Sequence, residues 1–544
     1  MNSISSAYDY PLLVKQLLIT PLVHSPDQEI VYAETSRYTY RTLRQRIGRL
    51  ANALAGLGVK HGQTVAVMDW DTSRYLECYF AIPMMGAVLQ TVNVKLATEQ
   101  ILYTLNHARA DVLLINAEFL PILDSIADRL ETVGKVILMK DSPESVQTEI
   151  DFAGHYEDLL AASRPDFDFP DFDENTRATT FYTTGTTGMP KGVFFSHRQL
   201  VLHSLSAAAG LGASPTQGRL HREDVYMPLT PMFHVHAWGL PYVATMLGLK
   251  QVYPGAYFPE RLLRLIRNEG VTFSHCVPTV LHLLLNHPHA SEVDLTRLKL
   301  MAGGAALPQT MAIEAQRRGI DVFTGYGMSE TCPILTVAHL SDANASSAPE
   351  HQAKLRSKTG LPLPLVDLNV VDENMKGLPH DGSSVGEIVV RSPWLTQGYL
   401  KDPDASEDLW TGGYLHTGDI GHIDSSGYLQ ITDRAKDVVK TGGEWISSLQ
   451  MENVLLQHPA VHEVAVIARA DAKWGERPLA LVHLKPDYQG NVSEADLRKH
   501  VVAQADKNGL GRFAILVTIL FVDNLLKTSV GKTNKRELRK RYGS

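Results

Sequence analysis

The chain has 544 residues, which at roughly 100 to 200 residues per domain means several domains and excludes a peptide hormone or a single module. Apolar residues make up 44% and charged residues 20%, close to globular averages, so most of the chain can bury a core. The 51 Lys and Arg against 59 Asp and Glu give a net charge of -8, which argues for a soluble protein and against a general nucleic-acid binder.

The expected elements begin with an alternation of helix-like and strand-like runs, a pattern that predicts parallel sheets covered by helices. In chain order we expect a helix at 43–57, strands at 64–68, 111–115 and 135–139, a helix around 262–266, a strand at 271–277 and a helix at 309–318. The body is therefore predicted to be α/β.

From about residue 366 the strands become shorter, at 366–371, 386–390 and 428–432, and Gly, Asp and Ser turns separate them, which predicts a β subdomain. A helix at 447–456, strands at 464–467 and 479–484 and a helix from 493 then predict a small α+β unit of about 110 residues. We expect a large N-terminal domain over 1–435, with α/β layers and the β subdomain, and a small C-terminal domain over 436–544.

The cysteines and the apolar runs indicate the cellular compartment in which the protein is expected. Cys78, Cys276 and Cys332 are far apart and odd in number, which fits a reducing compartment and offers neither a disulfide framework nor a zinc spacing. The N-terminus lacks the basic region and the cleavage site of a signal peptide. The apolar run 513–522 is too short to span a bilayer and is expected to be a buried strand. A cytoplasmic protein follows.

The strongest motif is YTTGTTGMPKG at 182–192. It offers backbone N–H groups, hydroxyl donors and one cation to a polyphosphate through Thr183, Thr184, Gly185, Thr186, Thr187, Gly188 and Lys191. It is not a Walker A loop, because Pro190 stands where that pattern requires glycine. A flexible surface loop would not explain the Pro-Lys-Gly end, so the motif predicts phosphate binding.

Further motifs follow in order. The segment PMFHVHAWG at 231–239 fits the core better than a metal site, because its His pair lacks a third ligand nearby. The glycines of AGGAA at 302–306 and TGYGMSET at 324–331 let a flat base approach the backbone, and Glu330 can hold Mg²⁺. Asp419 in YLHTGD suits ribose hydroxyls, although Asp and Arg in β turns are ordinarily structural.

The last 18 residues contain seven Lys and Arg against Glu537 alone. This run is either a solvated terminus or a region that meets phosphates. It includes KTSVGK at 527–532.

Together these segments, with DRAKD at 433–437 and KTGGEWISS at 440–448, resemble the motifs of the AMP-forming acyl-CoA synthetases, the superfamily that includes firefly-type luciferases. The resemblance covers nearly the whole chain in colinear order. The sequence Gly-Gly-Glu-Trp looks most like that of the medium- and long-chain fatty acyl branch. The chain departs from the family pattern at Leu526, where a proline usually stands, and lacks the usual Leu-Pro turn in 509–516.

The resemblance implies ATP, Mg²⁺ and coenzyme A as cofactors. It implies catalytic roles for Lys532, Glu330 and His234, with His234 beside the substrate carboxylate, and makes Trp238 a gate to the acyl tunnel. It places Thr183 and Glu330 on magnesium.

For the nucleotide, the resemblance places Gly304 and Tyr326 at adenine, Asp419 at ribose with Arg434 nearby, and Lys436 at the hinge of a mobile small domain. The remaining residues expected to bind cofactors are Thr184, Gly185, Thr186, Thr187, Gly188, Lys191, Val235, Thr324, Gly325, Ser329, Lys440, Gly443 and Trp445.

The implied reaction activates a carboxylic acid as acyl-AMP, releases pyrophosphate and then forms a thioester with CoA. The leading hypothesis is a ligase for medium- or long-chain fatty acids. Alternatives are a CoA ligase for a short or functionalised acid such as 3-methylthiopropionate or an aryl acid, a non-catalytic nucleotide-binding scaffold, and an adenylation domain that loads a carrier protein. A homodimer is expected by analogy alone.

Overall fold

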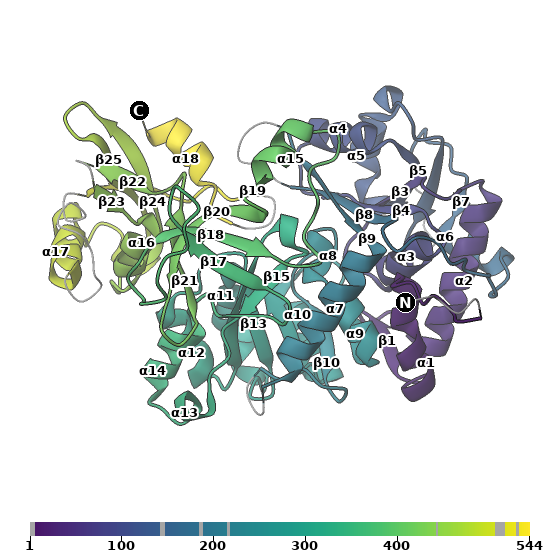
Figure 1. Cartoon of the computed structure of the whole chain (residues 1–544), viewed down its shortest axis with the longest axis horizontal. Coiled ribbons are helices and arrows are strands. Elements are labelled where there is room, and N and C mark those ends of the chain that lie inside the picture. Colours follow the sequence, from purple (N-terminus) through teal and green to yellow (C-terminus); the bar gives the residue numbers. More distant parts are fainter. Residues whose placement is uncertain are drawn as a thin grey trace.

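The computed structural model describes residues 6–141, 147–183, 189–214, 218–441, 444–505, 517–528 and 532–543. Within these ranges the strands form four β-sheets, and Figure 1 shows the N-terminal body at one end of the molecule and the small C-terminal unit at the other. The predicted α/β fold with a separate small domain of strands and helices is confirmed.

A seven-stranded sheet lies at the N-terminal end, in the order β7-β6-β5-β3-β4-β8-β9, in which all neighbouring strands are parallel except the antiparallel pair β8 and β9. Its strands are β3 (Thr64–Met68), β4 (Val88–Thr91), β5 (Ala110–Asn116), β6 (Lys135–Met139), β7 (Gly154–His155), β8 (Arg177–Tyr182) and β9 (Gly192–Ser196). The helix expected at 43–57 is confirmed as α2 (Tyr40–Gly56), which packs its apolar face on this core beside α3 (Ser73–Met84). The phosphate-loop motif joins β8 to β9.

A nine-stranded sheet follows, parallel in its centre and antiparallel at both edges, in the order β16-β15-β14-β13-β12-β10-β11-β1-β2. Its strands are β1 (Glu29–Tyr32), β2 (Ser36–Thr39), β10 (Val225–Pro228), β11 (Lys250–Tyr253), β12 (Phe273–Cys276), β13 (Lys299–Gly303), β14 (Asp321–Gly327), β15 (Ile334–Val337) and β16 (Leu361–Pro362). The helices α7 (His197–Gly212), α9 (Leu240–Leu247), α10 (Pro259–Glu269), α11 (Pro278–Asn286) and α12 (Gln309–Arg317) belong to this part, and α10 and α12 confirm the expected helices.

The expected β subdomain is an antiparallel sheet of five strands. These are β17 (Asp367–Val371), β18 (Gly386–Arg391), β19 (Trp410–Thr411), β20 (Tyr414–Ile423) and β21 (Leu429–Arg434), with the short helix α15 (Pro403–Leu409) inserted. Figure 1 shows this sheet between the α/β body and the C-terminal unit. Because β20 and β21 are neighbours, Asp419 and Arg434 lie opposite each other in register.

The small C-terminal unit has its own apolar core, which includes Val454, Val466 and Val482. Its elements are β22 (Val439–Thr441), β23 (Glu444–Ile446), α16 (Ser448–Leu456), β24 (Val461–Asp471), β25 (Gly475–Leu484), α17 (Glu494–Ala505), β26 (Thr518–Phe521) and α18 (Lys535–Tyr542). The helix expected at 447–456 and the strands expected at 464–467 and 479–484 are confirmed.

The expectation of a buried strand over 513–522 is wrong in part. Residues 513–516 lie outside the described residues, and β26 pairs in parallel with β25 and with no other described strand. Ile519 is buried, whereas Leu520 and Phe521 are 38% and 36% exposed. An apolar run does not distinguish a central strand, buried on both sides, from a strand at the edge of a sheet. This run forms an edge strand.

The three cysteines are buried free thiols. In the part of the chain that the structure describes, no helix is long and apolar enough to cross a bilayer.

Candidate functional site

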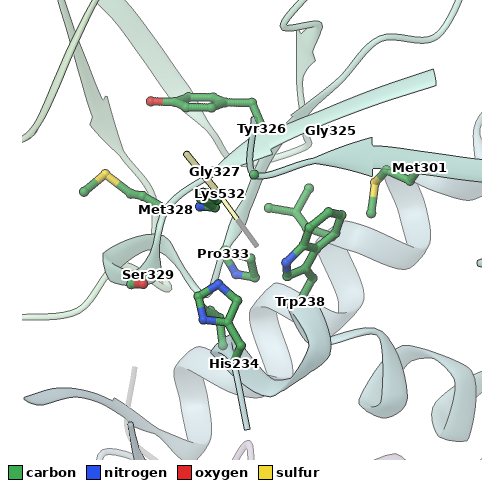
Figure 2. A pocket seen from close by; sticks show the side chains of 13 residues that line it. His234, Trp238, Met301, Gly325, Tyr326, Gly327, Met328, Ser329, Pro333 and Lys532 are labelled. Carbon is green, nitrogen blue, oxygen red and sulfur yellow. The ribbon is translucent and has the colours of Figure 1, made fainter. Parts of the chain in front are cut away.

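A cavity of about 40 Å³ lies where the carboxyl ends of β13 and β14 meet the segment before α9 and the loop that precedes α18. In open α/β sheets ligands bind beyond the carboxyl ends of the strands. The lining brings together sequence motifs that are far apart in the chain: His234, Val235, Trp238, Met301, Gly304, Gly325, Tyr326, Gly327, Met328, Ser329, Pro333, Ile334 and Lys532 (Figure 2).

The backbone from Val235 to Gly239 forms a left-handed turn, labelled α8 (Val235–Trp238) in Figure 1. Val235, His236 and Trp238 have φ values of 47°, 53° and 60°. Such values cost roughly 1–3 kcal/mol each for residues other than glycine, and they persist only where the surroundings impose them. The strain thus falls on the segment that presents His234 and Trp238 to the cavity.

The second histidine of this segment lies in the aromatic core. His236 is fully buried, and its ring lies edge-on to Phe181 at 5.1 Å between centroids. No group of three or more His, Cys, Asp or Glu side chains among the described residues could hold a metal ion. The His-x-His pair is therefore divided between the cavity and the aromatic core.

Trp238 closes one side of the cavity. Its indole lies 5.0 Å from the ring of His275, and a Cβ built on Gly303 would come within 2.9 Å of the indole Cη2. Gly303 therefore leaves the space that the indole fills. Trp238 is 7% exposed and belongs to the same apolar cluster as Met301. It is at once a core residue and a wall of the site.

His234 and Lys532 are far apart in the chain but both line the cavity, and Figure 2 shows the Lys532 ammonium between Tyr326 and His234. Burial and the Lys532 charge lower the pKa of His234 to about 3, so its imidazole is neutral at pH 7. Burial, and then the Arg434 guanidinium, lower the pKa of Lys532 to about 8. A lysine with this pKa is still largely charged at pH 7 and can act on an anion.

Gly304 makes room for Lys532. The φ of Gly304 is +75°, and a Cβ at this position would lie 3.1 Å from the Lys532 Cε and 3.3 Å from a methyl group of Val277. A side chain here would strain the backbone and crowd the ammonium. The loop that carries Lys532 is closed by a bond from the Thr528 N–H to the Lys532 carbonyl at 2.7 Å.

Asp419 lies beside Tyr326, which lines the cavity. Its carboxylate accepts a hydrogen bond from the Tyr326 hydroxyl at 2.7 Å and pairs with the Arg434 Nε at 3.0 Å. Asp419 is 2% exposed, whereas Arg434 is half exposed. These bonds orient the carboxylate and leave its remaining lone pairs for hydroxyl groups of a ligand.

Glu330 is linked to the phosphate-loop motif through Tyr399. The Tyr399 hydroxyl donates to Glu330 Oε1 at 2.7 Å, and the Lys191 ammonium lies 4.5 Å from the centroid of the Tyr399 ring. The Thr183 N–H donates to the Lys191 carbonyl at 2.9 Å. Glu330 is buried at 7% exposure. The Glu330 carboxylate and the Thr183 hydroxyl are both hard oxygen donors, the ligand type that Mg²⁺ prefers.

Other expected site residues lie apart from the cavity. The hydroxyl of Thr324 donates to the Arg356 carbonyl at 2.9 Å. Lys436 and Lys440 are exposed, and Lys440 is the register partner of Trp445 in the β22–β23 hairpin. Thr184, Gly185, Thr186, Thr187, Gly188, Gly443 and the side chain of Trp445 lie outside the described residues.

Sequence reasoning missed several residues of the site. Met301, Pro333 and Ile334 line the cavity, and Tyr399 holds Glu330. Met301 follows the buried pattern of β13, so its apolar character indicated core alone. Tyr399 lies in a Gly-Tyr pair whose only local signal is that of a turn.

This chain is similar to known proteins in sequence and in fold. Residues 22–400 match the AMP-binding enzyme family, and residues 450–532 match the AMP-binding enzyme C-terminal domain. A long-chain fatty acid–CoA ligase from Thermus thermophilus is 40% identical over 94% of this chain and 91% of the relative. A 3-methylmercaptopropionyl-CoA ligase from Ruegeria lacuscaerulensis is 37% identical over 98% and 97%. ATP-bound MatB from Rhodopseudomonas palustris matches with a TM-score of 0.83 at 25% identity, over 98% of this chain and 99% of that structure.

Proposed function

Since this chain belongs to the AMP-binding enzyme family and is an acyl-CoA ligase that uses ATP and CoA, we propose that its acid is a medium- or long-chain fatty acid whose tail passes Trp238. The observation that carries this proposal is the position of the indole, which lines the cavity and belongs to the same apolar cluster as Met301 and Phe323. A rotation of this one side chain would open a path into apolar surroundings, which suit a methylene chain.

In the first half-reaction the acid carboxylate attacks the α-phosphorus of ATP, and pyrophosphate leaves. Both reactants are anions, so the barrier falls when positioned donors and cations offset their charge. The Lys532 ammonium supplies this charge, and the neutral His234 imidazole can donate a hydrogen bond to the acid. The Asp419 carboxylate accepts from the ribose hydroxyls, while Gly304, Gly325 and Tyr326 border the base.

Glu330 and Thr183 are the residues that we propose to hold Mg²⁺, and Tyr399 keeps the Glu330 carboxylate oriented. When bound, this ion neutralises phosphate oxygens and orients the leaving pyrophosphate. The remaining loop residues of 184–188 and Lys191 would contact the phosphates through N–H, O–H and ammonium groups.

In the second half-reaction the CoA thiol attacks the acyl carbon and AMP leaves. We propose that the small domain, over 436–544, swings about Lys436 between the two steps. The swing would withdraw Lys532 and bring Gly443, Lys440 and Trp445 toward the pantetheine arm. A cytoplasmic location and a homodimer remain predictions.

A short or functionalised acid, such as 3-methylthiopropionate, is the second candidate. The cavity of about 40 Å³ beside Trp238 holds only a few water molecules. Behind the indole, the buried His275 bonds the Tyr226 hydroxyl through Nε2 at 2.9 Å, and its Nδ1 has no hydrogen-bond partner among the described residues. A polar group on a short acid would satisfy this nitrogen, whereas an alkyl tail would not.

Pyrophosphate release with ATP and Mg²⁺ separates the two candidates. We expect a maximum among straight-chain acids of six or more carbons, together with turnover that depends on CoA. The series runs from two to eighteen carbons, with 3-methylthiopropionate and benzoate added. A maximum on a short or decorated acid would replace the substrate and keep the reaction, whereas no release with any acid would contradict the proposed activity.

Removing the indole should change chain-length preference. For Trp238→Ala we expect the turnover ratio of a twelve-carbon to a four-carbon acid to rise at least about tenfold, because each methylene admitted to an apolar site contributes roughly 1–3 kcal/mol. Trp70→Ala is a matched control, since the Trp70 indole does not line the cavity and donates a hydrogen bond to Glu118, beside the seven-stranded sheet. An unchanged profile in a folded Trp238→Ala variant would return this residue to a purely structural role.

A further inference from the structure

Near its end, the last strand of the β subdomain carries a carboxylate that accepts hydrogen bonds from a helix of the small unit. Asp433 in β21 is 1% exposed, and its Oδ2 accepts a 2.5 Å hydrogen bond from the backbone N–H of Ser448, the first residue of α16. Its Oδ1 accepts a 3.0 Å bond from the Ser448 hydroxyl. A carboxylate at a helix N-terminus is stabilised by the unpaired N–H groups and the helix dipole. These bonds join the two parts of the molecule close to Lys436.

Lys535 completes this contact from α18. Its ammonium donates to the Ser448 hydroxyl at 2.7 Å and pairs with Glu452 Oε1 at 2.7 Å. Lys535 and Glu452 are largely buried, and the same carboxylate oxygen accepts the Val466 N–H at 2.7 Å. Burial raises the pKa of the Asp433 and Glu452 carboxyls, and the Lys535 charge opposes that rise. Removing this ammonium would leave two buried carboxylates without their cation.

The same lysine fixes the base of the loop that carries Lys532. Lys535 follows Lys532 by three residues and begins α18. Directly before it, the Asn534 N–H donates to the Leu526 carbonyl at 2.8 Å, which closes the loop. The two ends of the Lys532 loop and the start of α18 are therefore held together, and the hydrogen bond of Lys535 connects them to Ser448.

We propose that Lys535 is a positioning residue for acyl-adenylate formation, because it links the Lys532 loop through Ser448 to Asp433 of the β subdomain. This inference rests on the role proposed for Lys532 in the first half-reaction. A swing of the small domain about Lys436 would separate Asp433 from Ser448. The contact therefore serves the first half-reaction and is open in the second.

The test measures the two half-reactions of the full-length Lys535→Met variant separately. Adenylation is followed as pyrophosphate release without CoA, and thioester formation is followed with supplied acyl-AMP and CoA. We expect adenylation to fall at least about tenfold, since loss of one partner of a buried pair is strongly unfavourable, and thioester formation to stay within about twofold of wild type. Lys535→Arg should restore part of the adenylation rate.

Two further variants separate positioning from general stability. Lys540→Ala is the matched control, because Lys540 is an exposed lysine of the same helix that pairs with Glu537, and both half-reactions should stay unchanged. In a Lys532→Ala background, Lys535→Met should cause no further loss of adenylation, since it acts through Lys532. If Lys535→Met does not fold, Asp433→Asn, which removes the charge and keeps the shape, is expected to give the same split between half-reactions.

Equal losses in both half-reactions, an undiminished adenylation rate, or an additive loss in the Lys532→Ala background would overturn the proposal. All assays use the acid that gives the highest wild-type turnover. A wrong acid class is therefore visible in the wild type alone, whereas failure of the Lys535 role is visible only in the ratio of the two half-reactions.

Discussion

Replacing Lys532 with alanine is expected to lower the rate of acyl-adenylate formation by about 100- to 1,000-fold, the usual cost of losing one positioned charge-stabilising donor. Thioester formation from supplied acyl-AMP should stay within about threefold of wild type, because the proposed swing of the small domain withdraws Lys532 from the site before the CoA thiol attacks. The geometric reason is the space above Gly304, which admits the Lys532 side chain to the cavity. Equal loss of both half-reactions would refute the assigned role.

The pH dependence of adenylation provides a second check on Lys532. Its pKa, lowered to about 8, means that the ammonium is charged below that pH and loses its charge above it. The wild-type adenylation rate attributable to this group should therefore fall as the pH rises through about 8. Lys532→Arg keeps its charge at all accessible pH values and should abolish this fall, even if its rate is lower. A fall at the same pH in Lys532→Arg would point to another group.

Replacing Asp419 with asparagine is expected to weaken both half-reactions by roughly ten- to a hundredfold, because ATP and acyl-AMP carry the same ribose. Hydrogen bonds to a charged group contribute roughly 1.5–3 kcal/mol each. Asp419 is buried and oriented by Tyr326 and Arg434, so its loss cannot be offset by water as readily as on an open surface. The measurement is the KM for ATP together with the rate of CoA attack on supplied acyl-AMP.

Deoxynucleotides provide the matched comparison for Asp419. Wild type should discriminate against 2′-deoxy-ATP or 3′-deoxy-ATP, and Asp419→Asn should lose most of this discrimination because the missing hydroxyl no longer has a charged acceptor. The thermal unfolding temperature of the variant shows whether loss of the ion pair with Arg434 lowers the stability of the fold. Discrimination that stays at the wild-type level would place the ribose elsewhere.

Many elements could be predicted because their signals are local. The strand at Thr64–Met68 and the helix at Gln309–Arg317 follow apolar periodicity and flanking turn residues. The motif order also indicated the family, since closely spaced Gly, Thr and Lys residues define phosphate and nucleotide chemistry within one segment. The order of the motifs also allowed residues that line the cavity, such as Tyr326 and Lys532, to be predicted.

Local rules failed where long-range packing decides. No sequence rule predicts a left-handed turn that begins at the β-branched Val235, because its φ of 47° is unfavourable for an isolated segment. The run that includes β26 reads as a buried strand, yet its place at the edge of the sheet leaves Phe521 partly exposed. In both cases the surrounding fold overrides the local preference.

The sequence by itself determined the α/β class, the β subdomain, the small C-terminal unit and the chemistry of the motifs, because periodicity, turn residues and motif spacing act between neighbours in the chain. Only the tertiary structure decided that Trp238 lies over Gly303 and that Lys535 meets Ser448. These contacts depend on burial, close packing and the desolvation of charges, and a side chain acquires those properties only when distant segments come together.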